Sequence, residues 1–168
     1  MKHLQRPARR ALLVVHVAVS VSWLGLSVGL LALGITAYTT GDLSLTEAAY
    51  RAMKVFADWL LAPVAVVTLA SGLVLSLGTP WGLARHRWVW TKFWITLATA
   101  AATVFALRPE IEHAAAAGTP DPSLVVAPTV SMVAYLFMTA ISVLKPWGLT
   151  RRGRRLRLSA SSRKPLDG

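Results

Sequence analysis

Four long apolar stretches, each with at most one charged residue, alternate with short polar segments along this chain. They cover residues 11–38, 55–77, 88–107 and 124–144. An α-helix needs about 20 predominantly apolar residues to cross the hydrocarbon core of a bilayer, and each stretch reaches that length. The pattern predicts an all-α fold, an integral membrane four-helix bundle formed by residues 1–150. Residues 151–168 are basic and lack apolar periodicity, so we expect a disordered tail.

Local signals refine the limits and shape of these helices. The Ser-x-x-Glu sequence that begins at Ser44 resembles a capping box, which predicts that the second helix begins near Leu45. Pro63 lies inside the second helical pattern and Pro109 near the end of the third. A proline there removes a backbone donor, so we expect a kink at Pro63 and a perturbed end at Pro109. Pro128 falls in the first turns of the fourth helix, where proline is better tolerated.

Each expected helix carries one stripe of polar or small residues at helical spacing. In lipid such residues are expected to face the interior of a bundle, where they pack closely or form hydrogen bonds between helices. The four stripes therefore predict a compact bundle with these residues inside. In chain order they are His16, Ser20, Trp23, Ser27 and Gly34; Ala65, Thr68 and Gly72; Lys92, Thr96, Thr99 and Thr103; and Ser131, Tyr135, Met138 and Ser142.

The charges are sorted by segment. Fourteen of the 18 Lys and Arg lie before the first stretch, between the second and third, or after the fourth, where they meet one acid, Asp167. The other two connections hold three bases and five of the seven acids. Short cytoplasmic segments of membrane proteins are enriched in bases. We therefore expect a multi-pass protein of the bacterial cytoplasmic membrane with both termini in the cytoplasm.

The net charge of +11 would suggest nucleic acid as a partner if the protein were soluble. Here the bases flank membrane spans, so the bilayer and its anionic headgroups at the cytoplasmic face are the expected partners, and nucleic acid is not. A homo-oligomer or a membrane protein partner stays open. The chain has no cysteine, which excludes disulfides, thiolate metal sites and covalently attached c-type haem.

The sequence Pro-Trp-Gly-Leu-x-Arg occurs twice, at residues 80–85 after the second stretch and at residues 146–151 after the fourth. Proline and glycine end a helix, tryptophan favours the headgroup level, and arginine holds the end in the cytoplasm. The repeat supports placing both ends on one membrane face. Two tandem hairpins and two independent uses of one interfacial signal both explain it, and we favour the second.

His16 and Lys92 are the polar residues that helix packing explains least. Both lie a few residues inside the cytoplasmic ends of the first and third helices, at roughly 6–8 Å of depth. A neutral imidazole can ligate haem iron or another metal, and a lysine at this depth must snorkel, pair with an anion or lose its proton. Their shared depth predicts a joint site. The alternatives are a snorkelling Lys92 and a His16 that only forms a buried hydrogen bond.

Several motifs resemble a known group of membrane proteins. The stretch from His16 to Trp23 is similar to the first-helix motif of HemJ-type protoporphyrinogen oxidases and of copper-resistance D-like membrane proteins. Pro63 with Thr68 and Gly72 resembles their second helix. Trp88 with Lys92 resembles the start of their third. A closer likeness is to an uncharacterised bacterial family of four-helix membrane proteins with a domain of unknown function. Shared stretches there include residues 76–83 and 145–150.

The resemblance implies a b-type haem or porphyrin site. It assigns His16 as the ligand of the haem iron, Lys92 as a cofactor-binding residue and Trp23 as a further cofactor contact. The third-helix motif of the HemJ type has a histidine where this chain has Trp90. The start of the fourth helix, residues 126–128, reads Val-Ala-Pro and also has no histidine. The departures argue against two histidine ligands and against oxidation of the HemJ type.

Three functions stay open, and no catalytic residue can be named. A structural or accessory membrane protein without a cofactor comes first, because the small-residue stripes fit it well. A haem- or porphyrin-binding protein is the alternative. A small-solute or ion permease that acts as an oligomer comes last, because the ionisable residues lie near the membrane edges rather than the midplane. No HExxH zinc-protease, P-loop, nucleophile-elbow or dinucleotide motif is present. Whether the protein is an enzyme stays open.

Overall fold

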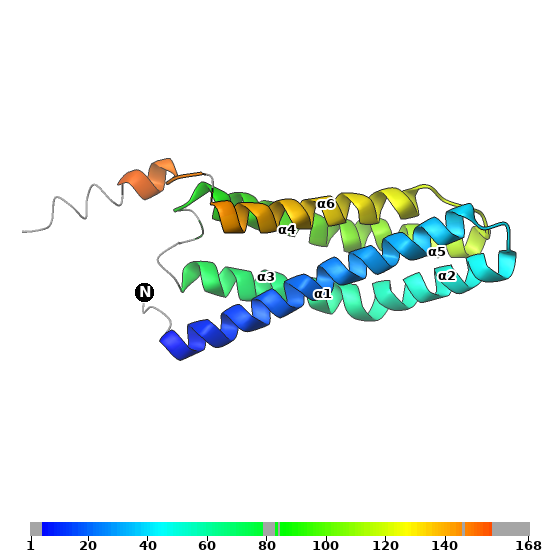
Figure 1. The fold of residues 1–168 in the computed structure, drawn as a ribbon, viewed down its shortest axis with the longest axis horizontal. Helices are drawn as coiled ribbons and strands as arrows, with labels where there is room; N and C mark the ends of the chain where they lie inside the picture. The colour runs from blue at the N-terminus through cyan, green and yellow to red at the C-terminus, as the bar shows by residue number, and fades with distance from the viewer. Residues whose placement is uncertain (1–4, 79–82, 84, 146, 156–168) are drawn as a thin grey trace, which may run out of the picture.

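The computed structural model describes residues 5–78, 83, 85–145 and 147–155, and within them the chain forms four long antiparallel helical rods (Figure 1). All four are long and apolar enough to cross a membrane, so the predicted all-α class with four candidate spans is confirmed. The rods are α1 (Arg6–Thr39); α2 (Leu43–Val55), η1 (Phe56–Leu61) and α3 (Ala62–Leu77); α4 (Arg87–Ala102), η2 (Thr103–Leu107) and α5 (Arg108–Ala117); and α6 (Ser123–Leu144).

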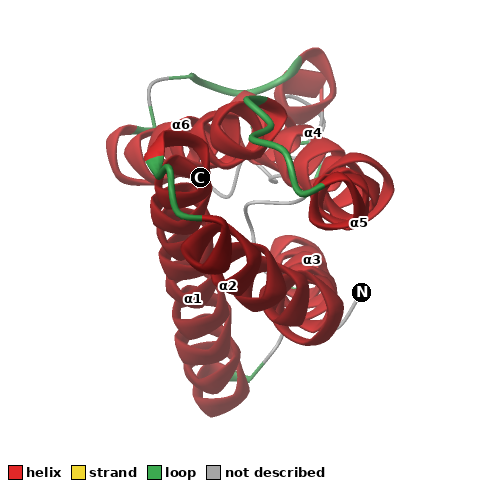
Figure 2. Cartoon of the chain, turned by 90° about the vertical axis from the view of Figure 1, so that its right-hand side faces the viewer, coloured by secondary structure: helices red, strands yellow, loops and turns green. Residues whose placement is uncertain are grey.

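The rods form a ring in which each packs against two neighbours. The first packs against the second and the fourth, and the third completes the ring between those two (Figure 2). The helices α1 and α4 therefore lie across the bundle from each other. We call the end that carries residues 6–10, 85–87 and 147–155 the basic end, and the opposite end the acidic end (Figure 1). Of the expected tail, residues 151–155 are helical and residues 156–168 lie outside the described residues.

The second rod begins two residues earlier than expected, with a different cap. Asp42, rather than Ser44, is the N-cap of α2, and its Oδ1 accepts hydrogen bonds of 2.8 Å from the Ser44 backbone N–H and from the Ser44 hydroxyl. These bonds hold the pKa of the Asp42 carboxyl below its usual value, and the bond from the Ser44 hydroxyl contributes most. The predicted capping box is therefore wrong, because an aspartate two residues upstream satisfies the first free N–H groups instead.

Two of the rods contain a π-helical turn, and each turn ends two residues before a proline. The segment η1 ends at Leu61, before Pro63, and η2 ends at Leu107, before Pro109. Proline lacks an N–H group, and its ring would collide with the carbonyl four residues earlier in a regular α-helix. A wider turn relieves that collision without ending the helix. The perturbations expected at both prolines therefore take the form of π-helical segments inside continuous rods.

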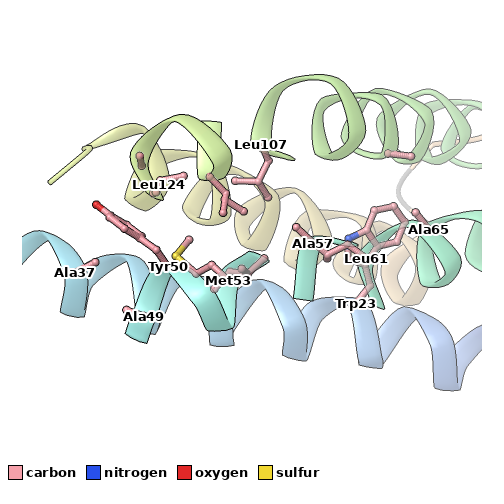
Figure 3. Close-up of a cluster of buried hydrophobic side chains, with 14 of the residues drawn as sticks. Trp23, Ala37, Ala49, Tyr50, Met53, Ala57, Leu61, Ala65, Leu107 and Leu124 are labelled. Carbon is pink, nitrogen blue, oxygen red and sulfur yellow. The ribbon is translucent and has the colours of Figure 1, made fainter. Parts of the chain in front are cut away.

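The apolar core is concentrated in the middle of the bundle and towards the acidic end. Trp23 is 1% exposed and packs near Leu61 and Ala65, while Met53 and Leu107 continue the core towards the acidic end (Figure 3). Large apolar side chains also cover much of the outer surface of the rods. An apolar exterior of this kind suits a lipid environment. Most of the stripe residues face inward as predicted, and the buried ones are Trp23, Ser27, Gly34, Ala65, Thr68, Thr103, Tyr135 and Met138.

The rods α1 and α6 come close to each other at Gly34. A Cβ atom on Gly34 would overlap the carbonyl oxygen of Leu124. That carbonyl has no N–H donor four residues later because residue 128 is proline, and Pro128 is itself buried inside α6. The glycine lets the two backbones come together where α6 has a free carbonyl, which is the use of small residues typical of membrane helix interfaces.

Polar contacts join the second and third rods near the acidic end. Asp58 pairs with Lys54 at 3.1 Å and with Arg108 at 2.8 Å, and Lys54 also reaches Glu112 at 3.1 Å. The Tyr50 hydroxyl donates to the carbonyl of Thr119 at 2.9 Å. Lys54 and Asp58 thus pair within the second rod, and each also pairs with a residue of the third. These groups are partly exposed, so they fix the relative position of the rods more than they stabilise them.

Candidate functional site

His16 lies against the second rod rather than in lipid. Its Nδ1 is 2.9 Å from the Ser71 hydroxyl, and its ring covers Gly72, where a Cβ atom would come within 3.1 Å of the imidazole Cε1. The Ser71 hydroxyl donates its single proton to the carbonyl of Val67 at 2.6 Å. Ser71 must therefore accept a hydrogen bond from Nδ1–H. In the tautomer that fits this bond, the neutral ring carries its proton on Nδ1 and its lone pair on Nε2.

Lys92 is arranged in the same way on the opposite side of the bundle. Its Nζ donates to the Ser142 hydroxyl of α6 at 2.6 Å, and that hydroxyl donates to the carbonyl of Met138 at 2.6 Å. Both ionisable side chains thus use a serine on the next rod, and each serine returns its own proton to the helix backbone. Lys92 points to a partner inside the bundle, which is not the snorkelling conformation considered from the sequence.

These four residues lie in one layer near the basic end. Gly34 lies against Leu124, and eleven residues earlier on α1 the Trp23 ring meets Tyr135 of α6, eleven residues later, with centroids 5.0 Å apart. The same antiparallel register places His16 level with Ser142. Since Ser71 contacts His16 and Lys92 contacts Ser142, each rod contributes one member. Lys92 is also close enough to His16 to interact with it electrostatically. We call this set, His16, Ser71, Lys92 and Ser142, the polar layer.

The polar layer lies where the bundle is loosely packed. On α1 no described residue before Trp23 is buried, and on α4 none before Ala100 is. His16, Lys92 and Ser142 are all half-buried, whereas the core begins about two turns deeper. The layer therefore lies near the basic end, where α1 and α4 contribute no buried residue and Ser71 of α3 is the buried member.

Two buried hydroxyls below the layer have no hydrogen-bond partner within the described part of the chain. They are Thr68 Oγ1, one turn from Ser71 on the same face of α3, and Tyr135 Oη, beside Trp23. Thr99 lies next to the tyrosine, but the geometry between them is not that of a hydrogen bond. A buried unpaired hydroxyl costs about 1–3 kcal/mol, so these two sites favour a water molecule or a polar ligand group.

The electrostatics of the layer favour an anion. The described carboxylates all lie on the acidic side of the polar layer: Asp42, Glu47, Asp58, Glu110, Glu112 and Asp121. Among the described residues no group of three or more histidines and carboxylates that could hold a metal ion occurs. A bound group would therefore meet one imidazole and one ammonium, without a competing carboxylate.

The structure brings His16 and Lys92 to one layer, as the sequence predicted, but the rods that carry them are not neighbours. The role of Trp23 differs from that of the other two: it lies about two turns deeper, in the core against Tyr135. Sequence reasoning missed Ser71, although its spacing of three from Thr68 places it on the same helical face. A serine beside Gly72 was a usable signal for a hydrogen-bonding partner.

The residues of the layer fit one axial ligand of haem and one anionic substituent. A ligating histidine usually donates its second ring N–H to a fixed acceptor, and Ser71 provides that acceptor for His16. The unpaired hydroxyls of Thr68 and Tyr135 lie below it. Met138, a further potential ligand, accepts a hydrogen bond at its sulfur from Thr96 at 3.2 Å. Of the described histidines, His86 and His113 lie outside the layer, at the N-cap of α4 and in α5.

Comparison of the chain with models of protein families, with curated proteins and with solved structures finds no match.

Proposed function

We propose that this chain is a four-span protein of the cytoplasmic membrane with both termini in the cytoplasm. The separation of the basic and acidic ends supports this orientation, because bases are enriched in short cytoplasmic segments. The apolar exterior of the four rods supports insertion in lipid.

Reporter fusions test the orientation. Alkaline phosphatase, which is active only after export, should be active when fused after Gly41 and inactive when fused after residue 84 or at the C-terminus. A green fluorescent protein fused at the same sites should give the reverse pattern. Active phosphatase at the C-terminus would contradict the proposal.

We further propose that the polar layer binds a ligand that enters from the cytoplasmic side, and that this ligand is b-type haem. The observation that carries the proposal is the hydrogen bond between His16 Nδ1 and Ser71, which orients the imidazole of a half-buried His16 at the level of Lys92. Bound haem would supply redox or ligand-binding chemistry at its iron. His16 would hold the iron, and Lys92 would pair with a propionate after leaving Ser142.

Replacing His16 should abolish haem binding. In a titration of haem into the purified protein in detergent, the wild type should show a shifted Soret band and His16→Ala should show the spectrum of free haem. His113→Ala, which removes a histidine from α5, is the matched control and should bind as the wild type does. Ser71→Ala should weaken binding by roughly tenfold, because it removes the acceptor that orients the imidazole. Equal binding by His16→Ala and the wild type would contradict the assignment.

Replacing Lys92 should weaken binding only for a ligand with free carboxylates. Lys92→Met should lower the affinity for haem by roughly 10-fold to 100-fold, the usual contribution of a hydrogen bond to a charged group. Its affinity for haem dimethyl ester, in which both propionates are neutral, should equal that of the wild type. A similar loss for both ligands would show that Lys92 acts by packing rather than by charge.

One observation favours the structural or accessory function instead. His16 and Lys92 each already have a hydrogen-bond partner, so without a ligand the polar layer can tie the first rod to the second and the third to the fourth. On that function His16→Ala would lower stability or partner association and change no spectrum. The permease function has less support, because buried apolar residues such as Leu30 and Leu61 fill the bundle between the layer and the acidic end.

A further inference from the structure

The two copies of the Pro-Trp-Gly-Leu-x-Arg repeat meet at the basic end of the bundle. The first residues of both copies lie outside the described part of the chain, but an antiparallel bridge joins His86, which directly follows the first copy, to Leu149 of the second. The Thr150 backbone N–H donates to the carbonyl of Arg85 at 3.0 Å, and that of Arg87 donates to Gly148 at 3.4 Å. The two segments, which the sequence presented as independent helix ends, therefore form one unit.

The segment after α6 is docked on this bridge. The Thr150 hydroxyl donates to the Arg85 carbonyl at 3.2 Å and accepts from the Gly153 N–H at 3.0 Å, which caps the helical turn of residues 151–155. Gly153 is buried against Arg85, and a Cβ atom there would overlap the Arg85 carbonyl oxygen. A side chain at position 153 would thus push the turn away. We call residues 85–87 and 148–155 the basic bracket.

The basic bracket carries several arginines on a backbone that its hydrogen bonds hold in place. Arg87, at the start of α4, and Arg151, Arg152 and Arg154 of the docked turn are all exposed. The described carboxylates lie towards the other end of the bundle. A guanidinium binds phosphate oxygens through two parallel hydrogen bonds, so a fixed group of arginines is suited to a phosphate.

Aromatic residues place the bracket at the membrane surface. The Trp147 ring contacts Phe137 of α6, with centroids 6.4 Å apart, so the strand that leads into the bracket folds back on the outer face of the bundle. Trp90 and Trp94 are exposed on the first turns of α4, next to Arg87. Tryptophan favours the headgroup level of a bilayer. With these tryptophans at the headgroup level, the arginines of the bracket would lie at the level of the lipid phosphates.

We propose that the basic bracket is a binding site for the headgroup of an anionic phospholipid. The lipid phosphate is held by the arginines of the docked turn and by Arg87, and the acyl chains lie along α4 and α6. The site depends on the position of the turn as well as on its charge, because Gly153 and Thr150 hold the turn on the other repeat.

The test measures binding of a fluorescent phosphatidylglycerol to the full-length protein in neutral detergent, with phosphatidylcholine as the uncharged comparison. The triple variant Arg151→Gln, Arg152→Gln and Arg154→Gln should bind phosphatidylglycerol roughly 100-fold more weakly, at about 1 kcal/mol for each charge. Gly153→Val keeps every charge but displaces the turn, and it should weaken binding at least about tenfold. Gly148→Ala is its matched control, since a Cβ there meets nothing within 4 Å, and it should bind normally.

Several results would overturn the proposal. If the triple variant binds as the wild type does, the arginines do not hold the lipid. If Gly153→Val binds normally while the triple variant does not, the attraction is diffuse charge rather than a built site. If glycerol 3-phosphate competes as well as the lipid, the site takes a soluble phosphate. Circular dichroism of each variant, with an unchanged helical spectrum expected, ensures that a loss of binding is read on folded protein.

Discussion

Replacing Gly34 with alanine should separate α1 from α6 and lower the free energy of unfolding by about 2–3 kcal/mol. The added Cβ would overlap the Leu124 carbonyl oxygen, which is part of a helix backbone and cannot rotate away. Pro128 leaves the Leu124 carbonyl without a hydrogen-bond donor in its own helix. The Gly34 backbone, which lies close to that carbonyl, partly makes up for the missing hydrogen bond. Unfolding in mixed detergent and dodecyl sulfate micelles measures the change.

The same substitution at Gly25 provides the control. It lies on the same helix, is exposed, and a Cβ there meets nothing within 4 Å. Gly25→Ala should leave stability unchanged or raise it by about 0.5–1 kcal/mol, because alanine is the better helix former. Equal effects at both positions would show that the crossing of α1 and α6 is not set by Gly34.

Replacing Trp23 with alanine should lower the free energy of unfolding by about 3 kcal/mol, at the low end of the usual range for a buried tryptophan. The ring is 1% exposed and packs on Tyr135, so its removal leaves a void in the centre of the bundle. Lipid is as apolar as the core, so the cost comes from lost packing rather than from transfer out of water.

Trp59 is the matched control for this prediction, because it lies on η1 with 75% of its surface exposed. Trp59→Ala should change the free energy of unfolding by no more than about 0.5 kcal/mol. The same micelle unfolding assay measures both variants. A larger loss of unfolding free energy at Trp59 than at Trp23 would contradict the assignment of Trp23 to the core and of Trp59 to the outer surface.

Much of the fold could be predicted because membrane insertion imposes simple rules on sequence. Apolar length located the four rods, and the inward stripes located residues such as Trp23, Gly34 and Tyr135. The rules did not predict the N-cap of the second rod or the π-helical turns, because each of these features has a local alternative of similar energy. Asp42 and Ser44 can both cap a helix, and a proline such as Pro63 can be accommodated by a kink or by a π-helical turn.

The candidate site was predicted in part for a related reason. Depth along a helix can be read from the chain, so His16 and Lys92 were assigned to one level. The order of the rods around the ring cannot be read from one sequence, so the partners Ser71 and Ser142 on the intervening rods were not assigned. The pairing of the two repeats was missed because a single bridge between connections has no periodic pattern.

The central claim is that the polar layer is a ligand site for which His16 is the key residue. The most direct measurement is the absorption spectrum, oxidised and reduced, of the protein purified in detergent from cells supplied with a haem precursor. The wild type should show a Soret band that changes on reduction, and His16→Ala should show no such band. A colourless wild type, folded by circular dichroism, would contradict it and would favour the structural function of the layer.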